Sequence, residues 1–385
     1  MVDDPQVAKA QAYKCFEQGE FNGALNLLMS VYDPRGGDTE LANDIAVVLY
    51  RLGRTGEALN RFREAQAMCG EGRSLVADNL LDILERQLPD RGWPDLWQKD
   101  SAAELHRAAS RLSDEEWTQV LCDSVEGKPF DGHMLPGFIS EEDQRAFVGS
   151  SGVAALQEAA NFIRVVLKYA RGQGIAFDGK TRAVDFGSGW GRYTRFLLKY
   201  VHPDNLYGLE VHPRMVEHCR KSFGMGNFLK VESFPPCDLR DRLIDLVFGY
   251  SVFSHLSPDC ADAWIDEFAR ILRPGGLVLM TTQGRTFIEY CRKIRESGDR
   301  SHEWYTGLAN SFVDAEKSLK DYDAGEFLHA GHGQYGGTYG ESLVSEGYIE
   351  KHWRKYFDLL DFVDDRAFLP QALFVLKRKD NPYGA

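Results

Sequence analysis

Three glycines and two acids in the middle of the chain have the spacing of a nucleoside-binding site. The run from Asp185 to Gly191 reads Asp-Phe-Gly-Ser-Gly-Trp-Gly, and Glu210 follows about 20 residues later. Glycine adopts positive φ angles and lets the backbone approach a ligand closely. A carboxylate at this distance beyond such a turn can accept hydrogen bonds from ribose hydroxyls. The pattern therefore predicts a site for the ribose and the adjoining part of a nucleoside.

The position of the last glycine separates two kinds of nucleoside site. A Gly-x-Gly-x-x-Gly dinucleotide fold needs glycine at position 192, where this chain has Arg192. The run instead resembles the glycine loop of class I S-adenosylmethionine-dependent methyltransferases. The resemblance implies S-adenosyl-L-methionine as the cofactor, with the loop under its methionine part and Glu210 on its two ribose hydroxyls. The residues assigned to the cofactor are Asp185, Gly187, Ser188, Gly189, Trp190, Gly191, Glu210, Val211, Ser233, Tyr250 and Ser251.

Later motifs extend this resemblance along the chain. The segment 249–256, Gly-Tyr-Ser-Val-Phe-Ser-His-Leu, stands where the family has a motif after its fourth strand, and the segment 273–276, Arg-Pro-Gly-Gly, matches the turn before its fifth strand. Ser233 lies where the family often places a polar residue against adenine, although a solvated loop is the alternative. The Asn/Asp-Pro-Pro-Tyr signature of many nitrogen methyltransferases is missing after the fourth strand. This favours an oxygen atom as the methyl acceptor.

One histidine lies where a general base would help an oxygen nucleophile. An imidazole has an unperturbed pKa of about 6.5, so it can take a proton from a hydroxyl near neutral pH. His255 lies in this motif, where the fourth strand meets the helix that follows it, beside the expected methyl group. The alternative is a structural histidine that hydrogen-bonds its loop, and His329 and His332 are the next candidates for the base. No ligand spacing supports a metal site.

The elements that must position these residues are read from the hydrophobic pattern. Strands are expected at 182–186, 205–209, 228–231, 243–248, 277–281, 356–363 and 371–377, and helices at 153–171, 193–200, 213–223, 262–272 and 348–355. The alternating strands and helices indicate an α/β fold class, and the methyltransferase resemblance implies a Rossmann-like, seven-stranded methyltransferase sheet whose last two strands are antiparallel, preceded by an all-α module. We expect the methyltransferase domain over residues 146–380.

A long segment separates the fifth strand from the last two. Residues 286–345 have little strand character and are rich in histidine, tyrosine and glycine, most clearly in 331–340. Long insertions at the ligand end of a sheet are usually functional. We interpret this one as a substrate lid whose aromatic faces suit a sugar ring, with a mobile surface loop as the alternative.

The front of the chain contains an internal repeat. Gly19, Ala24 and Leu25 each recur 34 positions later, which is the tetratricopeptide period. Residues 1–90 therefore resemble a tetratricopeptide-like helical module, with a third helix at 75–88, and residues 91–145 are interpreted as a helical connector. The module either supports the enzyme or binds a partner. Docking within the chain or a homodimer is favoured over a foreign protein.

Composition limits the partners and the compartment. The net charge is −13 and no basic run stands out, which argues against a nucleic-acid partner. The seven cysteines are scattered without a zinc spacing, and the acidic N-terminus has no signal-peptide pattern. No apolar run is long enough to span a membrane. We expect a cytoplasmic protein with reduced thiols.

Three functions are compatible with these observations. The first is oxygen methylation of a sugar, a glycan or another small metabolite, and the sequence around 348–371 resembles bacterial methyltransferases found with surface-polysaccharide genes. The second is a protein methyltransferase that holds its substrate with the repeats. The third is a non-catalytic scaffold that binds cofactor, which the intact glycine loop and Glu210 argue against.

Overall fold

The structure is a computed structural model, and the chain divides into two units, residues 1–93 and 94–385. The residues that it describes are 5–18, 20–32, 38–52, 54, 57–58, 61, 65, 99–224, 227–299, 301, 303–331 and 339–380.

The first unit is helical throughout its described part. It contains α1 (Pro5–Glu17), α2 (Phe21–Val31) and α3 (Thr39–Arg51). The alanines of the predicted repeat, Ala12, Ala24, Ala46 and Ala58, all lie in its core. Such small side chains allow helices to approach closely. Gly19, Gly53 and the expected helix at 75–88 lie outside the described residues.

The second unit is built on one seven-stranded sheet, as predicted. The strand order is β3-β2-β1-β4-β5-β9-β8, and β9 is antiparallel to both of its neighbours, β5 and β8. The strands are β1 (Ala183–Phe186), β2 (Leu206–Glu210), β3 (Phe228–Lys230), β4 (Ile244–Gly249), β5 (Leu272–Thr282), β8 (Phe357–Val363) and β9 (Ala372–Arg378). The Arg-Pro-Gly-Gly segment, predicted as a turn, lies inside β5 beside a register irregularity with β4.

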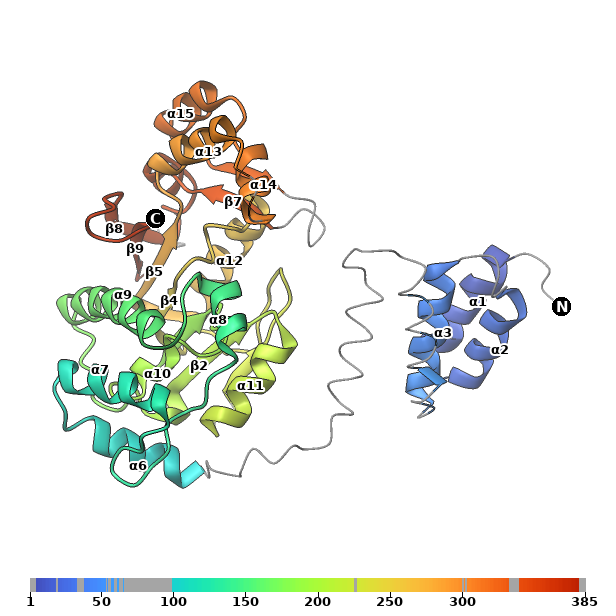
Figure 1. The fold of residues 1–385 in the computed structure, drawn as a ribbon, viewed down its shortest axis with the longest axis horizontal. Coiled ribbons are helices and arrows are strands. Elements are labelled where there is room, and N and C mark those ends of the chain that lie inside the picture. The colour runs from blue at the N-terminus through green and yellow to red at the C-terminus, as the bar shows by residue number, and fades with distance from the viewer. Residues whose placement is uncertain are drawn as a thin grey trace. The chain divides into compact units, whose positions relative to one another are not determined.

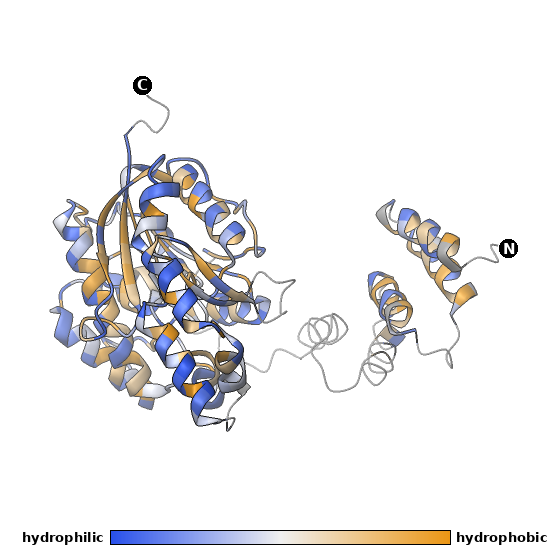
Figure 2. Cartoon of the chain, turned by 90° about the horizontal axis from the view of Figure 1, so that it is seen from above, coloured by the Kyte–Doolittle hydropathy of each residue, from blue (hydrophilic) through white to orange (hydrophobic). Residues whose placement is uncertain are grey.

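Helices cover both faces of this sheet because its central strands are apolar on both sides. Every residue of β1 and β4 is buried, and the strands form an apolar layer between helices with hydrophilic outer sides (Figure 2). The helices that follow single strands are α10 (Thr194–Leu197), α11 (Pro213–Phe223), α12 (Pro258–Ile271) and α16 (Glu346–His352). The long α9 (Gly152–Gly172) precedes β1, as expected, whereas α10 is shorter than the predicted helix at 193–200.

The segment interpreted as a connector packs into the core of the second unit. It forms α6 (Lys99–Ala109), α7 (Asp114–Asp123), the short η1 (Ser124–Glu126) and α8 (Glu141–Val148). The Trp117 indole is buried and donates a hydrogen bond to the Phe196 carbonyl at 3.0 Å. His106 Nδ1 likewise lies 2.7 Å from the Leu198 carbonyl. These contacts tie 99–148 to the region that follows the glycine loop, so the packed unit begins earlier than residue 146.

The expected lid segment has a core of its own. It contains α13 (Thr286–Ser297), α14 (Glu303–Asn310) and α15 (Ala315–Asp323), followed by the antiparallel pair β6 (Leu328–Gly331) and β7 (Gly340–Leu343). The three helices cluster at one end of the second unit (Figure 1). Phe287, Ile288, Cys291, Leu308 and Leu343 pack together within it. The segment is therefore a small helical subdomain within its described residues.

In the described part of the chain, no helix combines the length and the apolar content needed to cross a membrane.

Candidate active site

The glycine loop joins β1 to α10, and each of its glycines has a positive φ. The φ angles are 72° at Gly187, 52° at Gly189 and 79° at Gly191. A Cβ on Gly187 would lie 2.4 Å from the side chain of Val252, and one on Gly191 would lie 2.5 Å from the Phe223 ring. A Cβ on Gly189 would meet nothing within 4 Å. Two glycines therefore allow close packing, and the middle one leaves open space for a ligand.

Glu210 lies at the end of β2 and holds the loop directly. Its Oε2 accepts a hydrogen bond from the Gly189 backbone N–H at 2.7 Å, and its Oε1 accepts one from His212 at 2.8 Å. The side chain is buried, and burial raises the pKa of the carboxyl, although these backbone bonds oppose the shift. Each carboxylate oxygen has a second lone-pair site. The residue can therefore accept two ribose hydroxyls and keep its loop contacts.

Asp185 is buried at the end of β1 beneath the same loop. Its Oδ2 accepts a hydrogen bond from the Thr194 hydroxyl at 2.6 Å, whereas its Oδ1 is buried without a partner. Burial raises the pKa of Asp185 to about 7. An orphaned buried acceptor is costly unless a ligand donor reaches it. The unused oxygen therefore fits a donor group of a bound cofactor.

This raised pKa predicts a pH-dependent stability. Between the ordinary pKa of about 4 and the folded value, the folded chain binds one more proton than the unfolded chain. The free energy of unfolding should therefore fall as the pH rises towards 7, by up to about 1.4 kcal/mol per pH unit, relative to Asp185→Asn. Denaturant unfolding of both proteins without cofactor, followed by tryptophan fluorescence at several pH values, measures this difference. Parallel profiles for the two proteins would contradict it.

The remaining predicted cofactor residues differ in their burial and in their partners. The Trp190 indole is buried against Phe138, with ring centroids 5.9 Å apart, so it supports the loop from the core. Ser188 is buried and its hydroxyl has no partner. Val211 follows Glu210 and is 48% exposed. Ser233 is half-buried, and its carbonyl accepts a hydrogen bond from the Trp264 indole.

The turn after β4 is fixed by a network that includes a residue far away in the sequence. Ser251 has a φ of 61°, and its N–H donates to the Thr281 hydroxyl at 2.8 Å. The Gln371 amide donates to the Ser251 hydroxyl at 2.9 Å and accepts from Thr281 at 2.6 Å. Tyr250 packs edge-on against Phe162 of α9. The sequence analysis missed Thr281 and Gln371 as site residues, because they carry no motif.

His255 is held by the lid segment. Its Nδ1 lies 2.8 Å from the Gly340 carbonyl, and its ring stacks on Tyr339 with centroids 4.7 Å apart. A carbonyl only accepts, so Nδ1 carries the proton and the neutral ring has its lone pair on Nε2. The side chain is 19% exposed, and burial lowers the pKa of the imidazole. The arrangement favours a neutral histidine that can accept a proton at Nε2.

The segment 286–345 also brings a carboxylate and aromatic rings near this histidine. Glu341 is buried, its Oε2 lies 3.9 Å from His255 Nδ1, and its Oε1 accepts a hydrogen bond from the Trp304 indole at 3.1 Å. The Trp304 ring lies beside those of Tyr290 and Tyr305. The composition of the segment indicated the aromatic rings, but sequence reasoning missed Glu341. The alternative base His329 lies on β6 with its Nδ1 2.8 Å from the Ser342 hydroxyl, and His332 lies outside the described residues.

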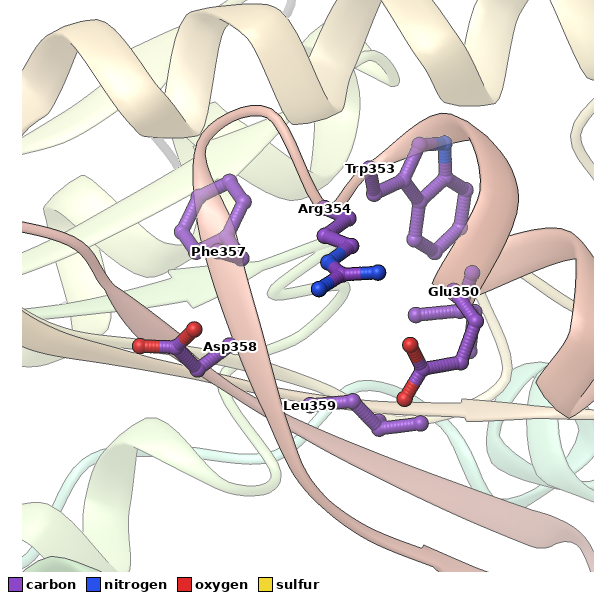
Figure 3. Close-up of a pocket in the computed structure, with 7 residues that line it drawn as sticks. Glu350, Trp353, Arg354, Phe357, Asp358 and Leu359 are labelled. Carbon is purple, nitrogen blue, oxygen red and sulfur yellow. The ribbon is translucent and has the colours of Figure 1, made fainter. Parts of the chain in front are cut away.

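A separate cavity lies between α16 and the start of β8. It has a volume of about 270 Å³ and is lined by Glu350, Trp353, Arg354 and their neighbours (Figure 3). None of the glycine-loop residues lines it. Among the described residues, no group of three or more His, Cys, Asp or Glu is arranged to hold a metal ion.

Comparison with known families agrees with this geometry. Residues 183–276, from β1 into β5, match the model of a methyltransferase domain family. This match includes the glycine loop, Glu210, the turn after β4 and His255. The fold and the site thus define a class I methyltransferase domain. The chain is an S-adenosylmethionine-dependent methyltransferase (EC 2.1.1), and S-adenosyl-L-methionine is its cofactor.

Solved structures share parts of this chain path at low sequence identity. An S-adenosylmethionine-dependent methyltransferase from Clostridium acetobutylicum is 11% identical over 62% of this chain and 99% of its own, with a TM-score of 0.41. A putative type 11 methyltransferase from Sulfolobus solfataricus is 18% identical over 53% of this chain and 87% of its own, with a TM-score of 0.32. The complex of the Haloferax volcanii Trm112 methyltransferase activator with a putative methyltransferase matches at 19% identity over 63% of this chain and 100% of that chain, with a TM-score of 0.33. None of these likenesses identifies the methyl acceptor of this chain.

Proposed function

We propose that the protein transfers the methyl group to a hydroxyl of a sugar, a glycan or another small metabolite. The observation that carries this proposal is the Nδ1 contact of His255 with the Gly340 carbonyl, because it places the proton on Nδ1 and leaves the lone pair of the neutral ring on Nε2. The neighbouring aromatic rings of Tyr290, Trp304 and Tyr305 provide flat apolar faces of the kind that a sugar ring packs against.

The chemistry assigned to the protein is positioning and proton transfer. When bound, S-adenosylmethionine supplies an electrophilic methyl group that needs no further activation. Asp185, Glu210 and the glycine loop would hold the cofactor, and Val252 packs the turn that leads to His255 against Gly187. His255 Nε2 would take the proton of the acceptor hydroxyl as the new C–O bond forms in line with the departing sulfur. The proton then passes from the imidazole to water.

Incorporation of tritium from methyl-labelled S-adenosylmethionine tests this proposal. The purified protein is incubated with fractionated lysate, and label is measured in low-mass, glycan and protein fractions. We expect label in the low-mass or glycan fraction that survives protease treatment. Label in protein would support the alternative, a protein methyltransferase. Transfer to no fraction, with cofactor binding intact, would support a non-catalytic scaffold.

The first unit is expected to be dispensable for cofactor binding. The first unit has a separate, alanine-rich hydrophobic core formed by its own residues, and the second unit begins at Pro94. A chain shortened to residues 94–385 should therefore bind S-adenosylmethionine with the affinity of the full-length protein, measured by calorimetry. Aggregation of the shortened chain would show that the first unit is structural.

The same pair of proteins tests what the first unit does. A homodimer through residues 1–90 predicts that sedimentation gives a dimer for the full-length protein and a monomer for the shortened one. Selective loss of activity on large acceptors would show that the helices hold the substrate, as a tetratricopeptide-like module would. If the two proteins have the same oligomeric state and the same activity on large acceptors, the first unit neither forms the dimer nor holds the substrate.

A further inference from the structure

Two buried arginines three positions apart follow the glycine loop, and they differ in how their donors are used. Arg192 is 6% exposed and Arg195 is fully buried. Arg195 is satisfied by main-chain carbonyls alone: its Nε donates to Gly191, and its two terminal nitrogens donate to Pro136 and Gly137. It therefore has a complete structural role in holding residues 136–137 on the loop.

Arg192 has no such complete set of acceptors. One terminal nitrogen donates to the Tyr193 hydroxyl, and the guanidinium stacks over the Tyr193 ring at 4.6 Å. The other lies 3.6 Å from a carboxylate oxygen of Glu158, a side chain that is 57% exposed. The Nε–H is buried without an acceptor. An arginine remains charged at all relevant pH values, so an unused buried donor of this kind is costly and suited to an anion.

The surroundings indicate which anion fits. Arg192 directly follows Gly191, and its charge acts on Asp185 beneath the loop and on Tyr250 at the end of β4. Asp185 contributes the unpartnered acceptor Oδ1, and the position of Gly189 is open. One loop thus presents an unused cationic donor and an unused carboxylate oxygen. This pair is complementary to the zwitterionic head of an amino acid.

We propose that Arg192 binds the α-carboxylate of the amino acid part of S-adenosylmethionine. The carboxylate would occupy the Nε side of the guanidinium, and the two other contacts of Arg192 would keep its plane in place. Glu158 is then a solvent-exposed neighbour that the ligand carboxylate can replace. Arg192 would contact the cofactor alone, so this contact does not depend on the identity of the methyl acceptor.

Calorimetry with two ligands isolates this contact. S-adenosylhomocysteine carries the carboxylate, and its decarboxylated amine analogue differs only by lacking it. Arg192→Gln should weaken S-adenosylhomocysteine binding about ten- to hundredfold, the range expected for a charge-assisted hydrogen bond. Binding of the analogue should change less than about twofold, which also shows that the variant is folded. Arg192→Lys should fall between the two, because it keeps the charge without the guanidinium geometry.

Matched variants separate this role from structural and acceptor roles. Arg164→Gln, on an exposed part of α9, is the control and should leave both affinities unchanged. Glu158→Gln should preserve or tighten S-adenosylhomocysteine binding; a loss equal to that of Arg192→Gln would overturn the proposal in favour of a structural ion pair. Equal weakening of both ligands by Arg192→Gln, or no weakening, would also overturn it. A different result would assign the guanidinium to the methyl acceptor. In that case Arg192→Gln would leave S-adenosylhomocysteine affinity unchanged, but it would abolish glucuronate binding to protein saturated with S-adenosylhomocysteine.

Discussion

Replacing His255 with alanine should lower turnover by roughly 10²–10⁴-fold and leave cofactor affinity nearly unchanged. The reason is the tautomer that the lid imposes: Nδ1 donates to the Gly340 carbonyl, so Nε2 is the proton acceptor. The measurement is methyl transfer to the fraction that accepts label, together with calorimetry of S-adenosylhomocysteine. His352 is an exposed histidine on α16, so His352→Ala serves as the matched control. This variant should keep both the turnover and the S-adenosylhomocysteine affinity of the native protein.

The pH profile adds a second readout for His255. Burial lowers the pKa of this imidazole, so its neutral form persists into more acidic solution than that of a free histidine. The acid limb of turnover should therefore lie below pH 6.5 and disappear in the alanine variant. Loss of folding or of cofactor binding in His255→Ala would make the residue structural. If activity survives, His329 and His332 become the candidates for the base.

Glu210→Ala should weaken S-adenosylmethionine binding by roughly 1–3 kcal/mol, because it removes a charged acceptor of the two ribose hydroxyls. It also leaves the N–H groups of Gly189 and His212 without their acceptor. Glu210→Gln keeps one amide oxygen for these bonds and should therefore lose less than the alanine variant. Calorimetry on both variants gives the two values, with Glu217→Ala on the surface of α11 as the control.

Lowering the pH should weaken S-adenosylmethionine binding, because it protonates Glu210 and removes the charge of its carboxylate. Burial raises the pKa of Glu210, and only the ionised form is the full acceptor, so affinity should begin to fall above the ordinary carboxyl pKa of 4.5 as the pH is lowered. The glutamine variant should lack this part of the pH dependence. An unchanged affinity in Glu210→Ala, or tighter binding of NAD than of S-adenosylmethionine by the native protein, would contradict the ribose-binding role.

The sequence determined the sheet and the cofactor loop because both depend on local pattern. Apolar runs that are buried on both faces mark parallel strands, and the antiparallel last pair was expected from the methyltransferase resemblance. The glycines at 187 and 191 are specified by positive φ and by close contact with Val252 and Phe223, which only a residue without a Cβ allows. The backbone geometry of the loop itself imposes these requirements, so the glycines can be recognised in a single sequence.

Only the tertiary structure decided which distant groups complete the site. Gln371 reaches Ser251 because β9 inserts beside β5, and Glu341 approaches His255 because β7 hydrogen-bonds to the turn after β4. The Nε–H of Arg192 is buried without an acceptor because of how the surrounding segments pack, whereas Arg195 finds its acceptors in main-chain carbonyls such as that of Pro136. Such contacts join residues far apart in the chain, where no periodicity or spacing relates them. Local pattern therefore specifies the glycine loop, whereas the packing of separate segments decides which ring nitrogen of His255 carries the proton.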